Sequence, residues 1–532
     1  MNSNTASVAF VVIALIAPSV DVSAASPESV QRGQRLFEQE WSPRNPTIGS
    51  DGLGPMFNGV SCAACHHQGG VGGGGDSRFN AQSIGIEQFE FSGVTFSEAE
   101  KLEALRNFYP GFAQSGALAN SAPLPHHGSS YAYAGIRSRV LSYVAARHSE
   151  EGGPANSHEV RNVTSTPITY HKQYRNRSFT LQARLFNRNT TSLFGSGLID
   201  NISGKAIEKQ VKLQSRHPEI SGRLSILRDG SIGRFGWRAN VGQLINFVDQ
   251  ACANELSLET KRREQPIDPG RPNYRNPSTD ISDAEIRSMS DFIATLPRPI
   301  EMQPSNPLSL ARVTRGREAF KAIGCAVCHA PDLGGVNGLY SDLLLHDMGP
   351  YLYDYDAAEP HVISQKLANE VREVPGSGAS SYHGASTTIG TSSEIPNSFQ
   401  SPRGSSQSDD FVTLDSKSLG RQVTRIDGTQ TSSAQIEEAI GIDRKLRPSN
   451  TSQEWRTPPL WGVADSSPYM HDGRAETLLE AIMLHDGESA GTRDRFLNLS
   501  LEDRRGVIAF LETLQAQGPQ REPAASELGL LD

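Results

Sequence analysis

The sequence predicts a mainly α-helical protein made of two similar domains, each enlarged by long loop insertions. The motif C-x-x-C-H occurs twice, at residues 62–66 and 325–329, and each copy follows the pattern R-G-x-x-x-F. Each half also ends in the pattern F-[IL]-[AE]-T-L. The chain of 532 residues is long enough for more than one core. Its 49 glycines and 31 prolines indicate that much of it is loop.

The N-terminal segment has the pattern of an export signal. Residues 8–16 form a short apolar run, and Val22-Ser23-Ala24 fits the small-residue pattern of a cleavage site. We therefore expect a signal peptide at residues 1–24 and a periplasmic or otherwise exported protein. An uncleaved anchor is the alternative, because no Lys or Arg precedes the apolar run. No other segment stays apolar for about 18 residues, so no stable membrane span is expected.

The first predicted domain spans residues 27–300. Its opening segment, residues 32–37 (RGQRLF), places a glycine and an aromatic ring on one helix face. Its closing helix begins with a capping-box pattern at residues 282–285 (SDAE) and ends before Pro297. We expect these two helices to cross, with the glycine allowing close approach.

The second predicted domain spans residues 305–520 and repeats this arrangement. Residues 315–320 (RGREAF) correspond to the first opening segment, and a helix capped at residues 500–503 (SLED) corresponds to the first closing helix. Residues 376–418 are rich in Ser, Gly and Thr and lack hydrophobic periodicity, which predicts a flexible surface insertion.

The two C-x-x-C-H motifs carry the chemistry. Two thiols one helical turn apart can add to the vinyl groups of one porphyrin, and the following His binds its iron. Spacing alone also fits a redox C-x-x-C or a zinc site shared by both motifs, but the adjacent His and the export signal favour haem. We thus expect two covalently bound haem c groups in cytochrome c-like domains. The attachment residues would be Cys62, Cys65, Cys325 and Cys328, and the proximal iron ligands His66 and His329.

The net charge of the chain limits the classes of partner that it could bind. The formal charge is −9, and the sequence has no run of five or more basic residues, which argues against nucleic acid as a partner. Acidity favours a basic redox partner, such as a small cytochrome or copper protein. The fifth cysteine, Cys252, lies in a helical-looking segment, where a small buried side chain is the simpler reading and a reactive thiol the alternative.

A family resemblance extends this interpretation. Residues 457–461 (TPPLW) and 468–474 (PYMHDGR) resemble the second-domain signature of bacterial di-haem cytochrome c peroxidases. In that family the distal ligand of the second haem follows the His of H-D-G by fourteen residues, which here gives His485. The resemblance implies a bis-His iron of low potential. A surface or helix-end histidine is the alternative.

Other motifs are closer still to the di-haem oxidoreductase family, whose members are labelled peroxidase or thiol oxidoreductase with two cytochrome c haem sites. The resemblance covers nearly the whole chain except residues 376–418. The motifs that carry it are residues 51–58 (DGLGPMFN), 233–238 (GRFGWR), 340–349 (YSDLLLHDMG) and 454–462 (EWRTPPLWG).

The distal side of the first haem is less defined. No histidine lies between His67 and His126, so the removable distal His of the peroxidases has no counterpart. His126 and His127 are the nearest candidates, with loop positions as the alternative. Without a ligand, this iron would be open to substrate. The acid–base group that peroxide chemistry requires cannot be assigned among the many carboxylates.

Several further residues could surround the haems. Arg234 and Arg238 could pair with propionates. Trp237 could conduct electrons between the haems, with simple packing as the alternative. His471 fits a propionate or outer partner rather than an iron ligand. His346 and Met348 could flank the second haem.

The expected function is that of a peroxidase-like oxidoreductase, with haem 2 relaying electrons to haem 1. The alternatives are a non-catalytic di-haem electron carrier and a haem-dependent oxygenase or thiol oxidoreductase. A calcium ion is suggested by analogy with the peroxidases alone, because no EF-hand loop is found.

Overall fold

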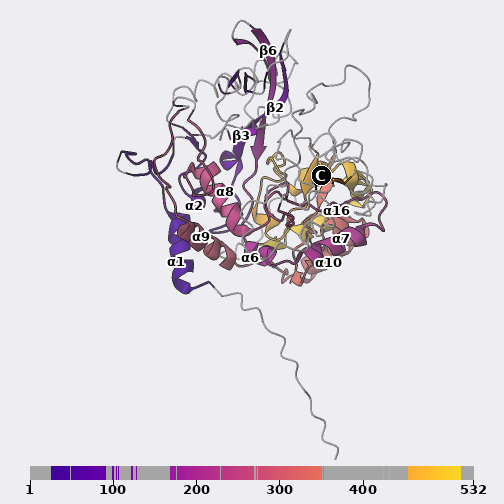
Figure 1. The fold of residues 1–532 in the computed structure, drawn as a ribbon. Coiled ribbons are helices and arrows are strands. Elements are labelled where there is room, and N and C mark those ends of the chain that lie inside the picture. The colour runs from indigo at the N-terminus through magenta and orange to yellow at the C-terminus, as the bar shows by residue number, and fades with distance from the viewer. Residues whose placement is uncertain are drawn as a thin grey trace, which may run out of the picture.

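The computed structural model describes residues 25–91, 177–349 and 453–516, with gaps of one or two residues (Figure 1). The predicted signal peptide at 1–24 and the predicted insertion at 376–418 lie outside the described residues. None of the described helices has both the length and the apolar character needed to cross a membrane. Shorter described pieces are residues 97–106 in part, 121–123, 127–128, 168–174, 352, 423–424 and 430–431.

Helix α1 (Pro27–Glu38) packs across α9 (Asp283–Thr295) in the first half. A Cβ placed on Gly33 of α1 would overlap the carbonyl oxygen of Ser288 in α9, so only glycine permits this approach. The rings of Phe37 and Phe292 lie 5.4 Å apart beside the crossing. The predicted crossing is confirmed, including its dependence on glycine.

Helix α10 (Pro307–Ala322) packs across α16 (Leu501–Leu511) in the same way. A Cβ on Gly316 would overlap the carbonyl of Gly506, and the rings of Phe320 and Phe510 again lie 5.4 Å apart. The two halves therefore repeat one helix crossing with the same glycine and aromatic positions. The exact domain boundaries at 300 and 305 stay a prediction.

Each C-x-x-C-H motif forms a single helical turn that follows the first helix of its crossing along the chain. Helix α2 (Cys62–Cys65) and helix α11 (Cys325–Cys328) each place their two cysteines one turn apart. Ser61 caps α2 by accepting a hydrogen bond from Ala64 N at 3.0 Å. The following histidines leave the helical conformation, which turns their rings back toward the helix frame.

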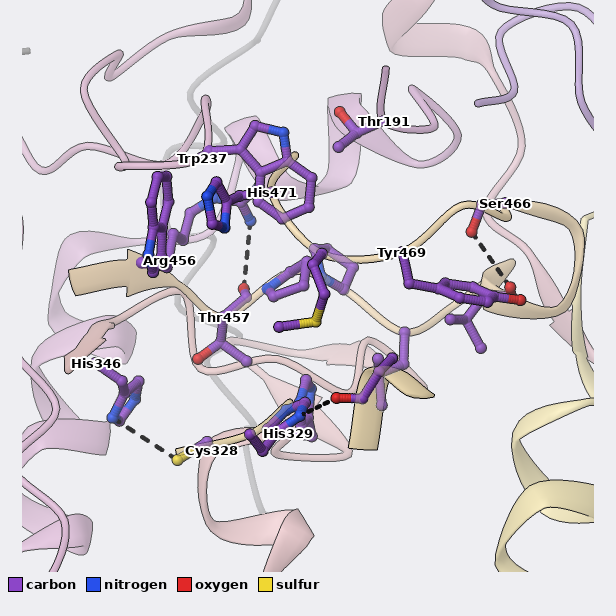
Figure 2. A pocket seen from close by; sticks show the side chains of 18 of the residues that line it. Thr191, Trp237, Cys328, His329, His346, Arg456, Thr457, Ser466, Tyr469 and His471 are labelled. Carbon is purple, nitrogen blue, oxygen red and sulfur yellow. Dashed lines mark hydrogen bonds between the residues drawn. The ribbon is translucent and has the colours of Figure 1, made fainter. Parts of the chain in front are cut away.

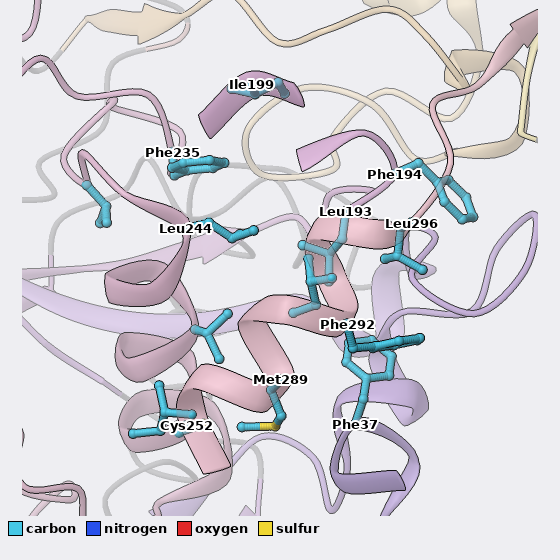
Figure 3. Close-up of a cluster of buried hydrophobic side chains, with 14 of the residues drawn as sticks. Phe37, Leu193, Phe194, Ile199, Phe235, Leu244, Cys252, Met289, Phe292 and Leu296 are labelled. Carbon is cyan, nitrogen blue, oxygen red and sulfur yellow. The ribbon is translucent and has the colours of Figure 1, made fainter. Parts of the chain in front are cut away.

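The larger hydrophobic core joins both halves of the chain. It contains residues of α6 (Ser196–Asp200) and α8 (Leu244–Leu256), which Figure 3 shows with Ile199, Leu244 and Cys252. Residues of α7 (Gly204–Gln214) and Leu344 and Trp461 of the second half belong to the same core. Cys252 lies on α8 with 2% of its surface exposed, so the reading as a buried side chain is confirmed.

The first half also contains a sheet that the sequence analysis did not predict. Strands β2 (Ala81–Phe91) and β6 (Arg177–Arg188) pair antiparallel within the order β3-β2-β6-β5 and extend away from the helices (Figure 1). β3 is Ser121–Pro123 and β5 is Ile168–Tyr174. The alternating residues 179–185 (FTLQARL) carry the period-two pattern of a strand, which the expectation of a loop insertion overlooked.

The second half has a smaller core around the α10–α16 crossing. Strand β10 (Leu345–Asp347) pairs antiparallel with β13 (Glu454–Arg456), and α14 (Leu478–Met483) and α15 (Ala490–Leu497) follow. The remaining short elements are β1 (Met56–Phe57), β4 (His127–Gly128), β7 (Ile300–Glu301), β8 (Asp332–Leu333), β9 (Val336–Asn337), β11 (Val423–Thr424), β12 (Gln430–Thr431), β14 (Leu514–Gln515) and the 3-10 turns η1 (Ser77–Phe79), η5 (Val463–Asp465) and η6 (Gly487–Ser489).

Candidate functional site

A cavity of about 260 Å³ lies against the second C-x-x-C-H motif (Figure 2). Cys325, Cys328 and His329 form part of its wall. The segment 455–471 and helices α14 and α15 contribute further sides. Most of its lining is apolar, as a pocket for a large flat macrocycle requires.

Two histidines face each other in this cavity. The ring centres of His329 and His485 lie 6.4 Å apart. His329 Nδ1 lies 3.0 Å from the carbonyl of Tyr340, and His485 Nδ1 lies 2.7 Å from the carbonyl of Ala481. A carbonyl only accepts, so each Nδ1 carries the hydrogen and each Nε2 keeps a lone pair for a metal.

The protonation of both rings suits this role. Burial lowers the pKa of His329 to about 4, and burial also lowers the pKa of His485. Both imidazoles are therefore neutral near pH 7, as iron ligation requires. Two metal–nitrogen bonds of about 2 Å, with roughly 1 Å more from each nitrogen to its ring centre, span about 6 Å. The spacing of the rings fits one iron between them.

The attachment cysteines are buried thiols. Burial raises the pKa of Cys325 to about 12 and also raises that of Cys328. The same cause raises the pKa values of Cys62 and Cys65 to about 12. These thiols stay protonated near pH 7, so addition to a vinyl group would need an outside base or a maturation system.

A haem carries two propionates, and a buried cation beside the cavity could pair with one of them. Arg456 lines the cavity with 7% of its surface exposed and donates from Nε to the carbonyl of Gly236 at 2.9 Å. Burial lowers its pKa to about 10, so it is still charged at pH 7. Within the described parts of the chain, no carboxylate forms an ion pair with it. A haem propionate would fit this fork.

The arginines expected at the propionates have other contacts. Arg234 lines the cavity but donates to the carbonyls of Ile202, Ile232 and Gly242. Arg238 donates to the carbonyl of Glu454 and stacks 3.9 Å above the Trp455 ring. Their role at propionates stays a prediction, and Arg456 is the cation that the sequence analysis missed inside a motif it had singled out.

Trp237 and His471 meet at the far side of the cavity. Trp237 donates from Nε1 to the carbonyl of Asn189 at 3.0 Å, and its ring lies edge-on to His471 (Figure 2). His471 stacks on Trp455 with ring centres 3.6 Å apart. His471 thus belongs to an aromatic stack of the wall, whereas His485 faces His329. Their predicted functions stay predictions.

The first motif repeats the proximal geometry of the second. His66 Nδ1 lies 3.0 Å from the carbonyl of Gly73, and burial lowers the pKa of His66 to about 4. The ring centres of Phe37 and His66 lie 6.3 Å apart, compared with 6.4 Å for Phe320 and His329. In both halves, therefore, a neutral imidazole lies beside a phenylalanine from the first helix of the crossing.

The distal candidates of the first motif are only partly covered. His126 lies outside the described residues. The backbone of His127 pairs with Phe57 through strands β4 and β1. His67 Nδ1 lies 3.1 Å from the carbonyl of Ala64 within its own turn. The distal ligand of the first haem stays a prediction.

One segment touches both sites. The backbone of Thr191 partly offsets the effect of burial on the pKa of His66, while Thr191 itself lines the second cavity. Beside it, Asn189 N donates to the carbonyl of His471 at 2.8 Å. Gln68, two residues after His66, donates to the carbonyl of Ser467 at 2.6 Å. No sequence pattern predicts the contact between Gln68 and Ser467. The two residues lie about 400 positions apart, and a polar side chain such as glutamine carries no mark of its partner.

His346 and Met348 both line the second cavity, and their place beside a haem stays a prediction. Cys328, Asp342 and His346 place ligand atoms within 4.8 Å of one another, a set that could hold a metal ion. Haem attachment would turn the Cys328 thiol into a thioether and remove the strongest of these three ligands. This set therefore competes with haem rather than adding to it.

Comparison with known proteins bears on the same region. Residues 443–514 match the family model described as "Di-haem oxidoreductase, putative peroxidase". This match confirms the family resemblance for residues 443–514. The matched segment contains Arg456, His471 and His485, so three residues that line the second cavity lie within it. The description of the family implies two haems.

Two solved structures also align with the chain. One is the hydrazine synthase of Kuenenia stuttgartiensis, with 14% identity over 67% of this chain and 79% of that chain and a TM-score of 0.27. The other is a MauG-like protein associated with microbial copper homeostasis, with 14% identity over 59% of this chain and 90% of that chain and a TM-score of 0.25. No curated protein matches the chain.

Proposed function

We propose that this chain is an exported di-haem c-type oxidoreductase that reduces peroxide, with electrons entering at the second site and passing to the first. The observation that carries the proposal is the second site, where the ring centres of two neutral histidines, His329 and His485, lie 6.4 Å apart. At the first site His66 repeats the proximal arrangement, and we infer that the other face of its iron is the one that peroxide reaches.

The second site suits electron transfer. Ligands on both faces of an iron leave no position for substrate, and two imidazoles favour a lower potential than His and Met. His329 and His485 are each oriented by a carbonyl, which limits their movement when the iron changes oxidation state. Bound haem would supply one-electron chemistry at both sites, and peroxide reduction at an iron with an open face.

The contact between the sites supports a relay. Residues 189–192 line the second cavity, the Thr191 backbone acts on the His66 ring, and Gln68 donates to the carbonyl of Ser467 at 2.6 Å. Trp237 lines the same cavity and donates to Asn189 in that segment. A short path of bonded and packed groups therefore connects the two motifs. An exported small cytochrome or copper protein would serve as the donor.

Spectra of the holoprotein test this proposal. We would produce the full chain with c-type cytochrome maturation and record optical and EPR spectra when oxidised and half-reduced, before and after peroxide. A high-spin signal at one haem that peroxide removes, with turnover using a reduced small cytochrome, is expected. Two low-spin haems that ignore peroxide in every redox state would contradict it and favour the electron carrier.

The oxygenase or thiol oxidoreductase alternative is separated by its products. If the protein takes up oxygen in the presence of a thiol or an organic substrate and does not turn over peroxide, then oxygen rather than peroxide is its oxidant. The Cys252→Ala variant is the matched control, since this buried thiol should not be required for either reaction.

A further inference from the structure

A buried group of charges lies beside the second attachment cysteine. His346 on β10 has 4% of its surface exposed. Its Nε2 lies 2.9 Å from Asp342 Oδ2, and its Nδ1 lies 3.0 Å from Glu488 Oε2. The same Nδ1 lies 3.7 Å from Cys328 Sγ (Figure 2). The proposed function assigns none of these three charged residues a role.

The geometry determines the charge of the ring. A neutral imidazole has one N–H, yet both nitrogens of His346 contact carboxylate oxygens. Each carboxylate is also bound by other donors. Asp342 accepts from Gln214 Nε2 at 2.5 Å and from Leu344 N at 2.9 Å. Donors on every side favour an ionised carboxylate, so both ring nitrogens carry hydrogen and the ring is an imidazolium.

Glu488 is held in the same way. Ser221 donates to it from its backbone nitrogen at 2.8 Å and from its hydroxyl at 2.7 Å. Burial opposes the charge on Glu488, but the hydrogen bond and charge of His346 outweigh it and lower the pKa. Burial also opposes the charge on His346, but its contacts with Cys328 and with the Asp342 carboxylate raise its pKa well above the ordinary value.

Two arginines act on the carboxylates of this group. Arg456 interacts with Asp342 and Arg223 with Glu488, while Arg223 itself pairs with Glu454. His346 is therefore the cation of this group that touches the attachment cysteine. Charges in a buried, poorly screened setting act on a nearby iron far more strongly than surface charges do.

We propose that the His346 imidazolium, held by Asp342 and Glu488 against Cys328, sets the reduction potential of the second haem. The inference rests on the proposed function to the extent that residues 325–329 carry haem c. Reduction removes one positive charge from the iron centre, so a nearby cation favours the reduced state and a nearby anion disfavours it. His346 is thus a positioning residue for charge, with no contact to substrate.

Two substitutions of similar shape test the idea in opposite directions. His346→Gln removes a positive charge and should lower the midpoint potential of the second haem. Glu488→Gln removes a negative charge and should raise it. Simple loosening of the pocket would move both potentials in the same direction. Potentials are read by optical titration at about pH 6, where the remaining Asp342 contact keeps His346 charged in the second variant.

Glu502→Gln is the matched control, because it makes the same charge change on a side chain that is 70% exposed. We expect its shift to be several times smaller than that of Glu488→Gln, since solvent and salt screen it. If His346→Gln does not accumulate, Glu488→Gln decides alone, and an unchanged or lowered potential would overturn the inference.

Haem content separates the two proposals. Loss of covalent haem at residues 325–329 in the unsubstituted protein would defeat the proposed function itself. Two attached haems with potentials that move together, or not at all, would defeat only the role of His346.

Discussion

The rings of His329 and His485 lie 6.4 Å apart, and each directs its Nδ1 hydrogen to a carbonyl of its own neighbourhood. The two residues come from different parts of the second half, one from the turn after α11 and one from the turn after α14. Their opposition requires both turns to be correctly placed, which makes the pair a sensitive probe of the site.

We expect His485→Ala to open the second iron. The low-spin spectrum of that haem should change to high-spin, and added imidazole should restore it, because the missing ligand is an imidazole. EPR and optical spectra of the holoprotein measure this. His217→Ala, on a histidine away from the cavity lining, is the control. An unchanged low-spin pair would mean that another residue closes the iron.

Haem stoichiometry tests the attachment sites. Replacing Cys62 and Cys65 together by Ala should leave one covalent haem, and so should replacing Cys325 and Cys328. Cys252→Ala should keep both, because Cys252 lies in the α8 core outside the motifs. Mass spectrometry and a haem stain after denaturation count the groups. Retention of two haems in either double variant would contradict the assignment.

The helix crossings predict that alanine substitutions at two glycines differ in their effect on stability. Gly316→Ala should lower the free energy of unfolding by about 1–3 kcal/mol, because its Cβ meets the Gly506 carbonyl. Gly491→Ala meets only an arginine nitrogen at 3.5 Å and should be neutral or stabilising by up to about 1 kcal/mol. Urea unfolding of both variants measures the difference. Equal effects would show that close approach is not the cause.

Stability should fall on acidification. The pKa values of His66 and His329 are lowered to about 4 in the folded chain by burial. Folding therefore favours the neutral rings, and this stabilisation is present above about pH 6.5 and lost as the pH falls toward 4. Each ring contributes a slope of up to about 1.4 kcal/mol per pH unit within that window.

Unfolding in urea between pH 7 and 4 measures this slope. Asp472 and Glu488 also have lowered pKa values, but they act only below their ordinary values of 3.8 and 4.5. The two contributions are thus separated by pH. A free energy of unfolding that stays level between pH 6.5 and 5 would contradict the assignment of neutral, buried histidines.

Local patterns explain what could be predicted from sequence. The glycine and aromatic of residues 32–37 and 315–320 lie on one helix face, so their periodicity is enough to predict the crossings. The assignment of His485 followed from a resemblance and stays a prediction, and the structure places its ring centre 6.4 Å from that of His329. The β2–β6 pair was missed because long insertions suggested loop, although the alternation of residues 179–185 predicts a strand.

Long-range contacts explain the rest. Arg456 lies inside a quoted motif, but only the fold shows that it is buried at the cavity with no ion-pair partner in the described chain. The charge of His346 likewise depends on Asp342 and Glu488, which meet only after β10 and η6 come together. Such environments arise from tertiary packing, which periodicity and spacing do not encode.

The shared segment at residues 189–192 has a consequence for dissecting this protein. Residues 189–194 and 234–237 of the first half line the cavity of the second motif, and the larger core crosses between the halves. A fragment that starts near residue 305 would keep both attachment cysteines and both facing histidines, yet it would lose one wall of the pocket. A fragment with an intact second site must therefore contain residues of both halves.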